Sequence, residues 1–221
     1  MGFLEKIIAG DGLHKSRFHD RKGHRIDMGG MRYLPRCLLS TFSRITFGMR
    51  PEIPWLGYRA LERIEQIING SNSILEFGSG MSTIWLAKRC LKLVSLESNR
   101  DWFVRVEKQL RLKNINNVDI RFVEGSEYFS LERFPNDYFD FVFIDGDYRD
   151  KCAQNCIKKL KHGGYIYLDD TDKGVNTKDN EFHTAERVLV DAVNLLNGTL
   201  EYFVDFVPTY FKVTEGLLVQ L

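Results

Sequence analysis

The stretch SILEFGSGMST, residues 73–83, decides which fold is expected for this chain. It predicts a short apolar strand, a turn at Gly78 and Gly80, and the start of a helix that runs to about Cys90. A strand that enters a helix through Gly-x-Gly places free backbone N–H groups at the helix N-terminus, which suits a nucleotide-like ligand. We therefore expect a ligand site at this turn.

Two positions in the stretch indicate the kind of ligand. The dinucleotide-binding fingerprint has a third glycine where this sequence has Thr83. Glu76 stands two residues before the first glycine, where an acid repels a pyrophosphate but can pair with an ammonium group. A ligand with an adenosine end and an amino-acid end therefore fits better than a dinucleotide.

The segment EFGSGMST, residues 76–83, resembles motif I of the class I S-adenosylmethionine-dependent methyltransferases, whose pattern is an acid, one residue and then Gly-x-Gly. The likeness covers about Pro54 to Leu221. It implies that S-adenosylmethionine is the cofactor. The resemblance also implies cofactor contacts for the residues of this motif, which are Glu76, Phe77, Gly78, Ser79, Gly80, Ser82 and Thr83.

Length and composition favour one globular domain with a sizeable core. The chain has 221 residues, of which 43% are hydrophobic and 28% charged. It contains no apolar run of membrane-spanning length and no convincing secretion signal at its start. Its four cysteines do not form a disulfide framework, and we expect buried thiols and a reducing, cytoplasmic location.

Charge is distributed unevenly along the chain. Between His14 and Arg50 nine Lys or Arg residues face two Asp, a balance of +7, although the whole chain carries only +1. We expect residues 1–50 to form a basic N-terminal extension and residues 51–221 to form the methyltransferase domain. The extension could meet a phosphate-bearing substrate or an anionic membrane surface, or act as a solvated segment or a homodimer contact. Its few aromatic residues argue against nucleic acid as a partner.

Hydrophobic periodicity predicts alternating strands and helices after residue 50, and no long helix before it, because glycines and Pro35 interrupt that segment. The expected helices are 55–68, 81–90, 99–112, 149–161 and 180–196. The expected strands are 73–77, 93–97, 118–123, 139–144, 165–168, 201–207 and 217–221. This order predicts an α/β fold with a doubly wound, mostly parallel, seven-stranded Rossmann-like sheet and an antiparallel last strand.

Acidic and small polar residues follow the second and third strands. Glu97 ends the second strand, where an acid can accept hydrogen bonds from both ribose hydroxyls in a methyltransferase or a dehydrogenase. The resemblance assigns this role to Glu97, with Ser98 beside it. It also implies that Gly125 and Ser126 hold the adenine. Ser126 could cap a short helix, and the two roles are compatible.

Three carboxylates follow the fourth and fifth strands. Asp145, Asp169 and Asp170 should meet in one crevice, because the carboxyl ends of parallel strands face the ligand. They would repel one another unless a cation or protons intervene. The arrangement resembles the catechol- and caffeoyl-type metal-dependent O-methyltransferases, which implies Mg²⁺ held by these three residues. Here Asp170 stands where that family has Asn.

A metal-free alternative rests on a second resemblance. The runs DGDYR (145–149) and LDDTD (168–172) are similar to a broad group of bacterial methyltransferases, some linked to surface-glycan synthesis. That likeness implies that Asp145 and Gly146 contact the cofactor, or that Asp145 acts as a base, with Asp170 as the second candidate. Tyr148 would orient the acceptor or cover the crevice.

Two histidines and two aromatic residues have roles that the sequence leaves open. His162 is expected to end a helix, and His183 is a candidate base above the crevice. Trp55 and Tyr58 either wall the ligand pocket or pack in the core.

The working hypothesis is S-adenosylmethionine-dependent methyl transfer to a hydroxyl of a small molecule or a glycan, with Asp145, Asp170 and Tyr148 as candidate catalytic residues. The alternatives are an NAD-type oxidoreductase and a non-catalytic S-adenosylmethionine-binding module. The sequence leaves the acceptor open among a sugar, a phenol, an amine and a lipid-linked glycan.

Overall fold

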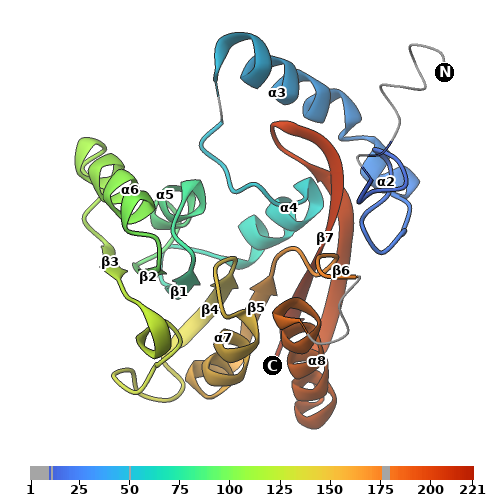
Figure 1. Ribbon diagram of the computed structural model, residues 1–221. Coiled ribbons are helices and arrows are strands. Elements are labelled where there is room, and N and C mark those ends of the chain that lie inside the picture. Colours follow the sequence, from blue (N-terminus) through green and yellow to red (C-terminus); the bar gives the residue numbers. More distant parts are fainter. Residues whose placement is uncertain (1–9, 11, 50, 176–179) are drawn as a thin grey trace, which may run out of the picture.

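The structure, a computed structural model, describes residues 10, 12–49, 51–175 and 180–221. Its strands form one seven-stranded sheet in the order β3-β2-β1-β4-β5-β7-β6 (Figure 1). Only β7 runs antiparallel to its neighbours, β5 and β6. The predicted fold class is confirmed. The strands are β1 (Ser73–Phe77), β2 (Lys92–Glu97), β3 (Val118–Phe122), β4 (Phe139–Ile144), β5 (Leu160–Leu168), β6 (Thr199–Val207) and β7 (Tyr210–Gln220).

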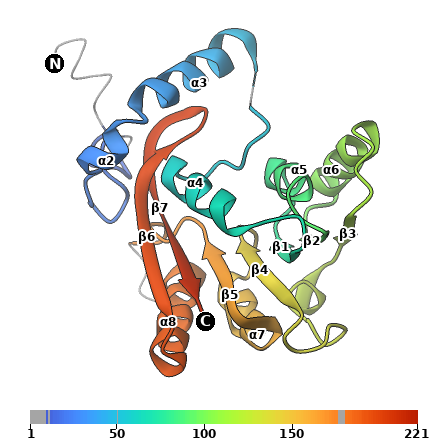
Figure 2. The same ribbon diagram turned by 180° about the vertical axis from the view of Figure 1, so that it is seen from behind.

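Helices cover both faces of the sheet. Figure 1 shows α7 and α8 in front of it, and Figure 2, from behind, shows α4 in front. The helices are α2 (Met28–Met31), α3 (Leu34–Phe47), α4 (Tyr58–Ile67), α5 (Met81–Ala87), α6 (Arg100–Leu112), α7 (Arg149–Cys156) and α8 (Glu181–Leu196), with short 3₁₀ turns η1 (Gly125–Glu127) and η2 (Ile157–Lys159).

Alternation along the central strands divides the core into two layers. In β4, Val142 and Ile144 pack against α7 and α8, whereas Phe141 and Phe143 pack with α4 and α5. All four side chains are buried, as expected for a parallel strand covered on both faces. The apolar run FVFI is thus explained by burial on both sides.

The sheet order creates a crevice between β1 and β4. These strands are neighbours, although β2 and β3 lie between them in the sequence. The chain therefore leaves the sheet in opposite directions from these two strands. The carboxyl ends of strands at such a switch point are where open α/β sheets bind ligands.

Two predicted boundaries near the C-terminus are wrong. The last strand begins at Tyr210 rather than 217, because residues 208–209 form a tight turn and the polar Lys212 and Glu215 obscured the strand pattern. The helix predicted for 149–161 ends at Cys156, and His162 lies within β5 rather than at a helix end.

The absence of a long helix before residue 50 was also a wrong prediction. Pro35 lies in the first turn of α3, where its missing N–H has no helical partner to lose, so it starts the helix instead of breaking it. Gly48 ends the helix with a left-handed φ of 67°.

The N-terminal segment packs on the rest of the chain. Ile26, Tyr33 and Cys37 share a buried cluster with Phe206 and Val213 of the β6–β7 hairpin. The division of the chain at residue 50 stays a prediction.

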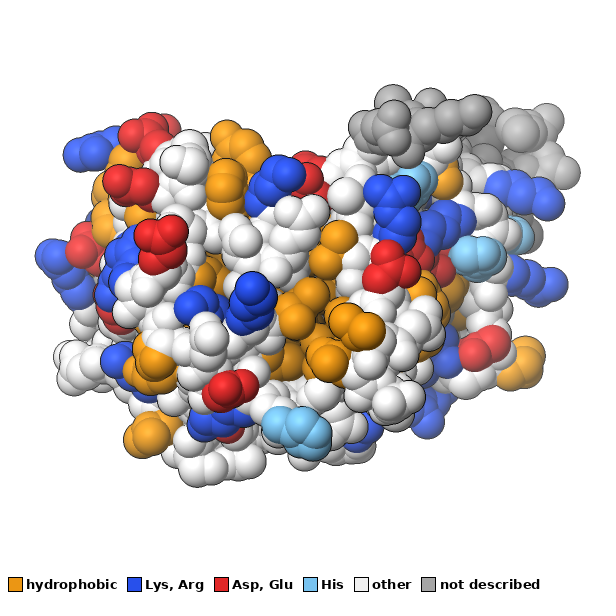
Figure 3. Space-filling model, turned by 90° about the horizontal axis from the view of Figure 1, so that it is seen from below, with side chains coloured by type: hydrophobic (Ala, Val, Ile, Leu, Met, Phe, Trp, Pro, Cys, Tyr) orange, Lys and Arg blue, Asp and Glu red, His pale blue; other side chains and the backbone are white. Residues whose placement is uncertain are grey.

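All four cysteines are free and buried, as predicted. Among the described residues, no helix has the length and apolarity needed to cross a membrane. The face at the amino ends of the strands (Figure 3) carries charged side chains of both signs toward its edges and hydrophobic side chains in its middle.

Candidate active site

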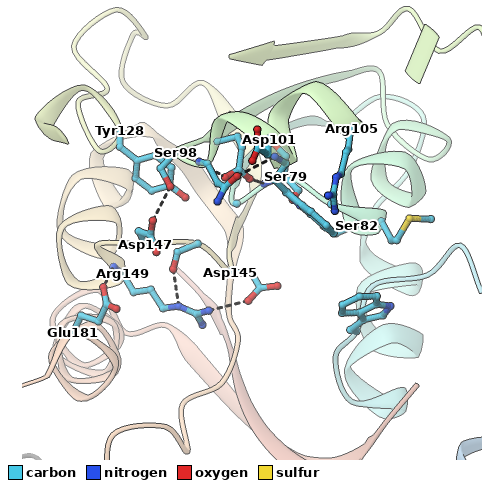
Figure 4. A pocket seen from close by; sticks show the side chains of 18 of the residues that line it. Ser79, Ser82, Ser98, Asp101, Arg105, Tyr128, Asp145, Asp147, Arg149 and Glu181 are labelled. Carbon is cyan, nitrogen blue, oxygen red and sulfur yellow. Dashed lines mark hydrogen bonds and ion pairs between the residues drawn. The ribbon is translucent and has the colours of Figure 1, made fainter. Parts of the chain in front are cut away.

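A cavity of about 730 Å³ opens at the carboxyl ends of β1, β2 and β4, the place predicted from the strand order. Figure 4 shows its side chains converging from the loops that follow these strands and from α6, α7 and α8. The lining residues are Trp55, Gly78, Ser79, Gly80, Met81, Ser82, Glu97, Ser98, Asn99, Asp101, Trp102, Arg105, Tyr128, Asp145, Gly146, Asp147, Arg149, Lys173, Glu181 and Phe182.

The floor of the cavity is made by two backbone turns in close contact. Gly78 has a φ of 91°, and a Cβ at this position would lie 2.7 Å from the carbonyl oxygen of Asp145. A Cβ on Gly146 would lie 1.8 Å from the Tyr128 hydroxyl. Both positions therefore require glycine. At Gly80, by contrast, the nearest atom to an added Cβ would be 3.6 Å away, so this glycine leaves space beside the turn.

Glu97 is fixed at the cavity wall by backbone amides from two elements. The N–H of Ser79 donates to Oε2 at 2.9 Å, and the N–H of Asn99 donates to Oε1 at 2.7 Å. Burial raises the pKa of this carboxyl, although the two amides oppose the shift. Each oxygen keeps a second lone pair, so Glu97 can accept further hydrogen bonds from a ligand with two hydroxyls.

Glu76 lies behind the glycine turn and is not among the residues that line the cavity. Its Oε2 accepts hydrogen bonds from Thr83 Oγ1 at 2.6 Å and Ser95 Oγ at 2.5 Å. Thr83 Oγ1 in turn accepts from the N–H of Gly80 at 2.8 Å. Burial raises the pKa of Glu76 to about 7. Glu76 therefore supports the turn through Oε2, and its contact with a ligand ammonium stays a prediction.

The structure brings the three predicted carboxylates together. One oxygen from each of Asp145, Asp169 and Asp170 lies within 4.8 Å of the other two. Asp145 lines the cavity, whereas the side chain of Asp169 is buried and that of Asp170 is only 13% exposed. Carboxylates held this closely need positive charge or protons to offset their repulsion.

Arg149 supplies much of that positive charge from within the fold. Its Nη2 lies 2.8 Å from Asp145 Oδ1 and 3.8 Å from Asp170 Oδ2. Its Nε donates to the carbonyl of Gly146 at 3.0 Å, and Nη1 donates to the carbonyl of Asp169. The buried guanidinium thus contacts all three strand-end acids or their backbone, and Figure 4 shows its contact with Asp145.

Protonation and a second cation complete the charge balance. Burial, together with the charges of Asp170 and Asp145, raises the pKa of Asp169 well above its usual value, which favours the protonated form of this carboxyl. Burial acts in the same direction on Asp170, but Lys173 and Arg149 outweigh it and lower its pKa. Lys173 Nζ contacts Asp170 Oδ2 directly. Arg149 and Lys173 thus place two cations against this group of acids.

Several predicted site residues lie away from the cavity. Phe77 and Thr83 are buried beneath it. Gly125 and Ser126 are exposed in η1, and Ser126 borders a separate hollow of about 600 Å³. Tyr148 has a left-handed φ of 51°, is 43% exposed, and packs edge-on against Phe129.

The structure also shows which of the aromatic and histidine candidates line the cavity. Trp55 lines the cavity, whereas Tyr58 is buried and stacks on Tyr33 with ring centroids 5.4 Å apart. His183 Nδ1 lies 3.3 Å from Asn180 Nδ2 in the first turn of α8 and is not part of the lining.

Sequence reasoning missed the side chains that reach the cavity from the starts of helices. These are Asn99, Asp101, Trp102 and Arg105 of the α6 region, Arg149 of α7, Glu181 and Phe182 of α8, and the loop residues Asp147 and Lys173. A usable signal was present, because each helix after a parallel strand begins at the ligand edge of the sheet.

Comparisons with known proteins agree with this geometry. Residues 75–171 match the family model described as a methyltransferase domain. No curated protein sequence matches the chain.

The solved structures with similar folds include three that are described as O-methyltransferases. One is TomG from Streptomyces achromogenes, in complex with S-adenosylmethionine, with a TM-score of 0.62, 18% identity and coverage of 88% of this chain and 99% of that one. The second, from Bacillus cereus in complex with S-adenosylhomocysteine, has a TM-score of 0.60, 17% identity and coverage of 83% and 97%. The third is a putative caffeoyl-CoA O-methyltransferase from Staphylococcus aureus, with a TM-score of 0.60, 17% identity and coverage of 88% and 99%.

Because the sequence identities are low, the solved structures are evidence for the fold alone. The family model is the evidence for a methyltransferase domain. Together they confirm the resemblance noted at residues 76–83. Over residues 75–171 the chain is thus similar to the methyltransferase-domain family.

Proposed function

We propose that this cavity transfers the methyl group of S-adenosylmethionine to a hydroxyl oxygen of a small molecule or a glycan, without a metal ion. The main support for the proposal is that a candidate ribose site at Glu97 and a candidate base, Asp145, line the same cavity. Glu97, held by the turn amides, suits a ribose, and Asp145 stands across the cavity beside a buried guanidinium.

The residues around the cavity fit the cofactor. Its volume of about 730 Å³ falls within the range of about 300–1,000 Å³ that is typical of small-molecule sites. Glu97 would accept the two ribose hydroxyls, with Ser98 beside it. The space beside Gly80, together with Ser79 and Ser82, would receive the amino-acid end.

Methyl transfer to a hydroxyl requires that the acceptor oxygen is aligned with the methyl group and that the hydroxyl proton is removed. When bound, S-adenosylmethionine supplies a methyl group already activated on a sulfonium, so alignment of the acceptor can lower the barrier by about 7–11 kcal/mol. Asp145 would take the proton of the acceptor hydroxyl. Burial, followed by the charge of Asp170, raises the pKa of Asp145 even though Arg149 opposes the shift, and a raised pKa favours a general base near neutral pH.

The metal-free form rests on Arg149 and Lys173. A divalent ion at Asp145, Asp169 and Asp170 would be repelled by Arg149 and Lys173, which already contact these acids. The donor set still consists of the hard oxygens that Mg²⁺ prefers, so the proposal needs a direct test against Mg²⁺.

The test of the proposed function is a turnover assay with methyl-labelled S-adenosylmethionine and a panel of phenols and sugars. We expect S-adenosylhomocysteine and an O-methylated product, and a loss of about 10²–10⁴-fold in rate for Asp145→Asn. The matched control is Asp191→Asn on the exposed face of α8. A methyl group found on nitrogen, or an unchanged rate in Asp145→Asn, would contradict the proposed chemistry.

A further inference from the structure

Helix α3 presents a row of large hydrophobic side chains to solvent. Leu39, Phe42 and Ile45 are 67%, 59% and 69% exposed, and Leu38 beside them is 44% exposed. These residues follow one another at spacings of one, three and three, so they lie on one side of the helix. Exposed apolar faces of this kind commonly mark an interaction surface.

The opposite side of α3 is fixed to the tip of the β6–β7 hairpin. The N–H of Thr209 donates to Ser40 Oγ at 3.0 Å, and Arg44 Nε donates to the carbonyl of Thr209 at 2.7 Å. The Arg44 guanidinium also lies 4.3 Å from the centroid of the Tyr210 ring. These contacts set the rotation of the helix, so its apolar row faces outward as a feature of the folded chain.

The sequence of this segment carries charge of one sign. Residues 28–51 contain four arginines (Arg32, Arg36, Arg44 and Arg50) and no acidic residue. Arg32 and Arg36 are exposed at the start of the helix. Arg36 lies over the Tyr58 ring at 4.7 Å, and Arg32 lies 3.2 Å from Glu62 of the neighbouring α4. An exposed apolar row with two exposed arginines, Arg32 and Arg36, at the start of the helix is complementary to an anionic lipid surface.

We propose that α3 binds the interfacial region of an anionic lipid bilayer, with Leu39, Phe42 and Ile45 inserted and Arg32 and Arg36 at the level of the phosphates. A second copy of the chain fits this face less well. A twofold contact would bring each patch against itself and so place arginines against arginines, and like charges across an interface are unfavourable.

The location of α3 gives this contact a consequence for the cavity. In both ribbon views α3 lies beyond the carboxyl ends of β4 and β5, the same end of the sheet that holds the cavity (Figures 1 and 2). The segment that follows α3 contributes Trp55 to the cavity lining. Binding through α3 would thus bring the cavity end of the molecule to the lipid surface. The binding itself does not depend on the proposed chemistry.

The test is sedimentation of the full chain with vesicles of phosphatidylcholine alone or with about a third of phosphatidylglycerol. We expect binding to the anionic vesicles that falls with added salt, and a loss of about tenfold or more in partitioning for Leu39→Glu and for Ile45→Glu. Arg36→Gln should lower partitioning roughly fivefold, since an arginine near such a surface is worth about that factor.

The matched control is Leu195→Glu, which changes a residue 80% exposed on α8. It should bind the vesicles as the unchanged chain does, and thermal unfolding should show all variants folded. The proposal is overturned if the unchanged chain ignores anionic vesicles, if it binds neutral ones equally well, or if Leu195→Glu loses as much binding as Leu39→Glu. It is also overturned if light scattering shows a dimer that Leu39→Glu dissociates, because a second copy would then occupy the face.

Discussion

Nη2 of Arg149 lies 2.8 Å from Oδ1 of Asp145, and the same nitrogen lies 3.8 Å from Oδ2 of Asp170. This guanidinium stands where three converging carboxylates would otherwise call for a metal ion. Lys173 contacts Asp170, and burial favours the protonated form of Asp169, so residues of the chain itself offset the repulsion among these acids. The choice between the two mechanisms left open by the sequence thus depends on Arg149.

The first prediction concerns the response to metal. We expect the unchanged protein to keep its unfolding temperature, its affinity for S-adenosylhomocysteine and its turnover after exhaustive chelation and after Mg²⁺ is added back. Thermal unfolding, calorimetry and the turnover assay measure this. Loss of turnover in the chelator that Mg²⁺ restores would refute the metal-free mechanism.

Removal of the internal cation gives the complementary prediction. Arg149→Met should lower the free energy of unfolding by about 3–5 kcal/mol, because it leaves buried carboxylates without their partner. Mg²⁺ should recover part of this loss in the variant only. The control is Lys151→Met, whose exposed ammonium pairs with Asp150 at 3.6 Å and should matter little. Equal effects of the two substitutions would contradict the role given to Arg149.

The close approach at Gly78 can be tested against a glycine with a similar backbone but no neighbours. Gly78→Ala should strongly destabilise the protein and abolish cofactor binding, because its Cβ would meet Asp145 and Gly146 within 2.8 Å. Gly23 has a φ of 89° and open space around it, so Gly23→Ala should cost only the left-handed backbone penalty of about 1–2 kcal/mol. Chemical denaturation compares the two, and equal losses would show that the contact at Gly78 is unimportant.

Glu76 predicts a pH dependence of stability. Its pKa in the folded chain is raised from 4.5 to about 7, so the folded state holds the proton more tightly than the unfolded state does. The stability linked to the protonated form is fully present below pH 4.5 and is lost as the pH rises through about 7. Glu76→Gln removes this loss.

The measurement is the free energy of unfolding of both proteins across this range. We expect the unchanged protein to lose stability relative to Glu76→Gln as the pH rises, with the difference levelling off above about 7. A constant difference would mean that folding does not shift the pKa of Glu76.

Much of the fold could be predicted from the sequence, because its signals are local. The buried run of β4 and the glycine turn after β1 each depend on residues a few positions apart. The start of α3 was missed for a local reason as well, since Pro35 was taken as a helix breaker when it occupies the first turn.

The site was predicted less completely, because it depends on contacts between distant residues. Glu97, Asp145 and the glycines follow strand ends and were found by position. The burial of Glu76 depends on Ser95 and Thr83, and the partners of Arg149 come from two strand ends. The spacing of residues in the sequence does not indicate that Glu76 is buried behind the glycine turn. It also does not indicate that Arg149 offsets the charge of the strand-end acids.

The most direct test of the account is calorimetry of S-adenosylhomocysteine with the unchanged protein and with Glu97→Ala. We predict micromolar binding, about −8 kcal/mol, to the unchanged protein. Glu97→Ala should bind at least about tenfold more weakly, since ribose hydroxyls and the amides of Ser79 and Asn99 would lose their acceptor. Glu201→Ala, which removes an exposed partner of Arg63, should bind normally. Absence of heat with S-adenosylhomocysteine, together with clear binding of NAD, would contradict the assignment of this cavity.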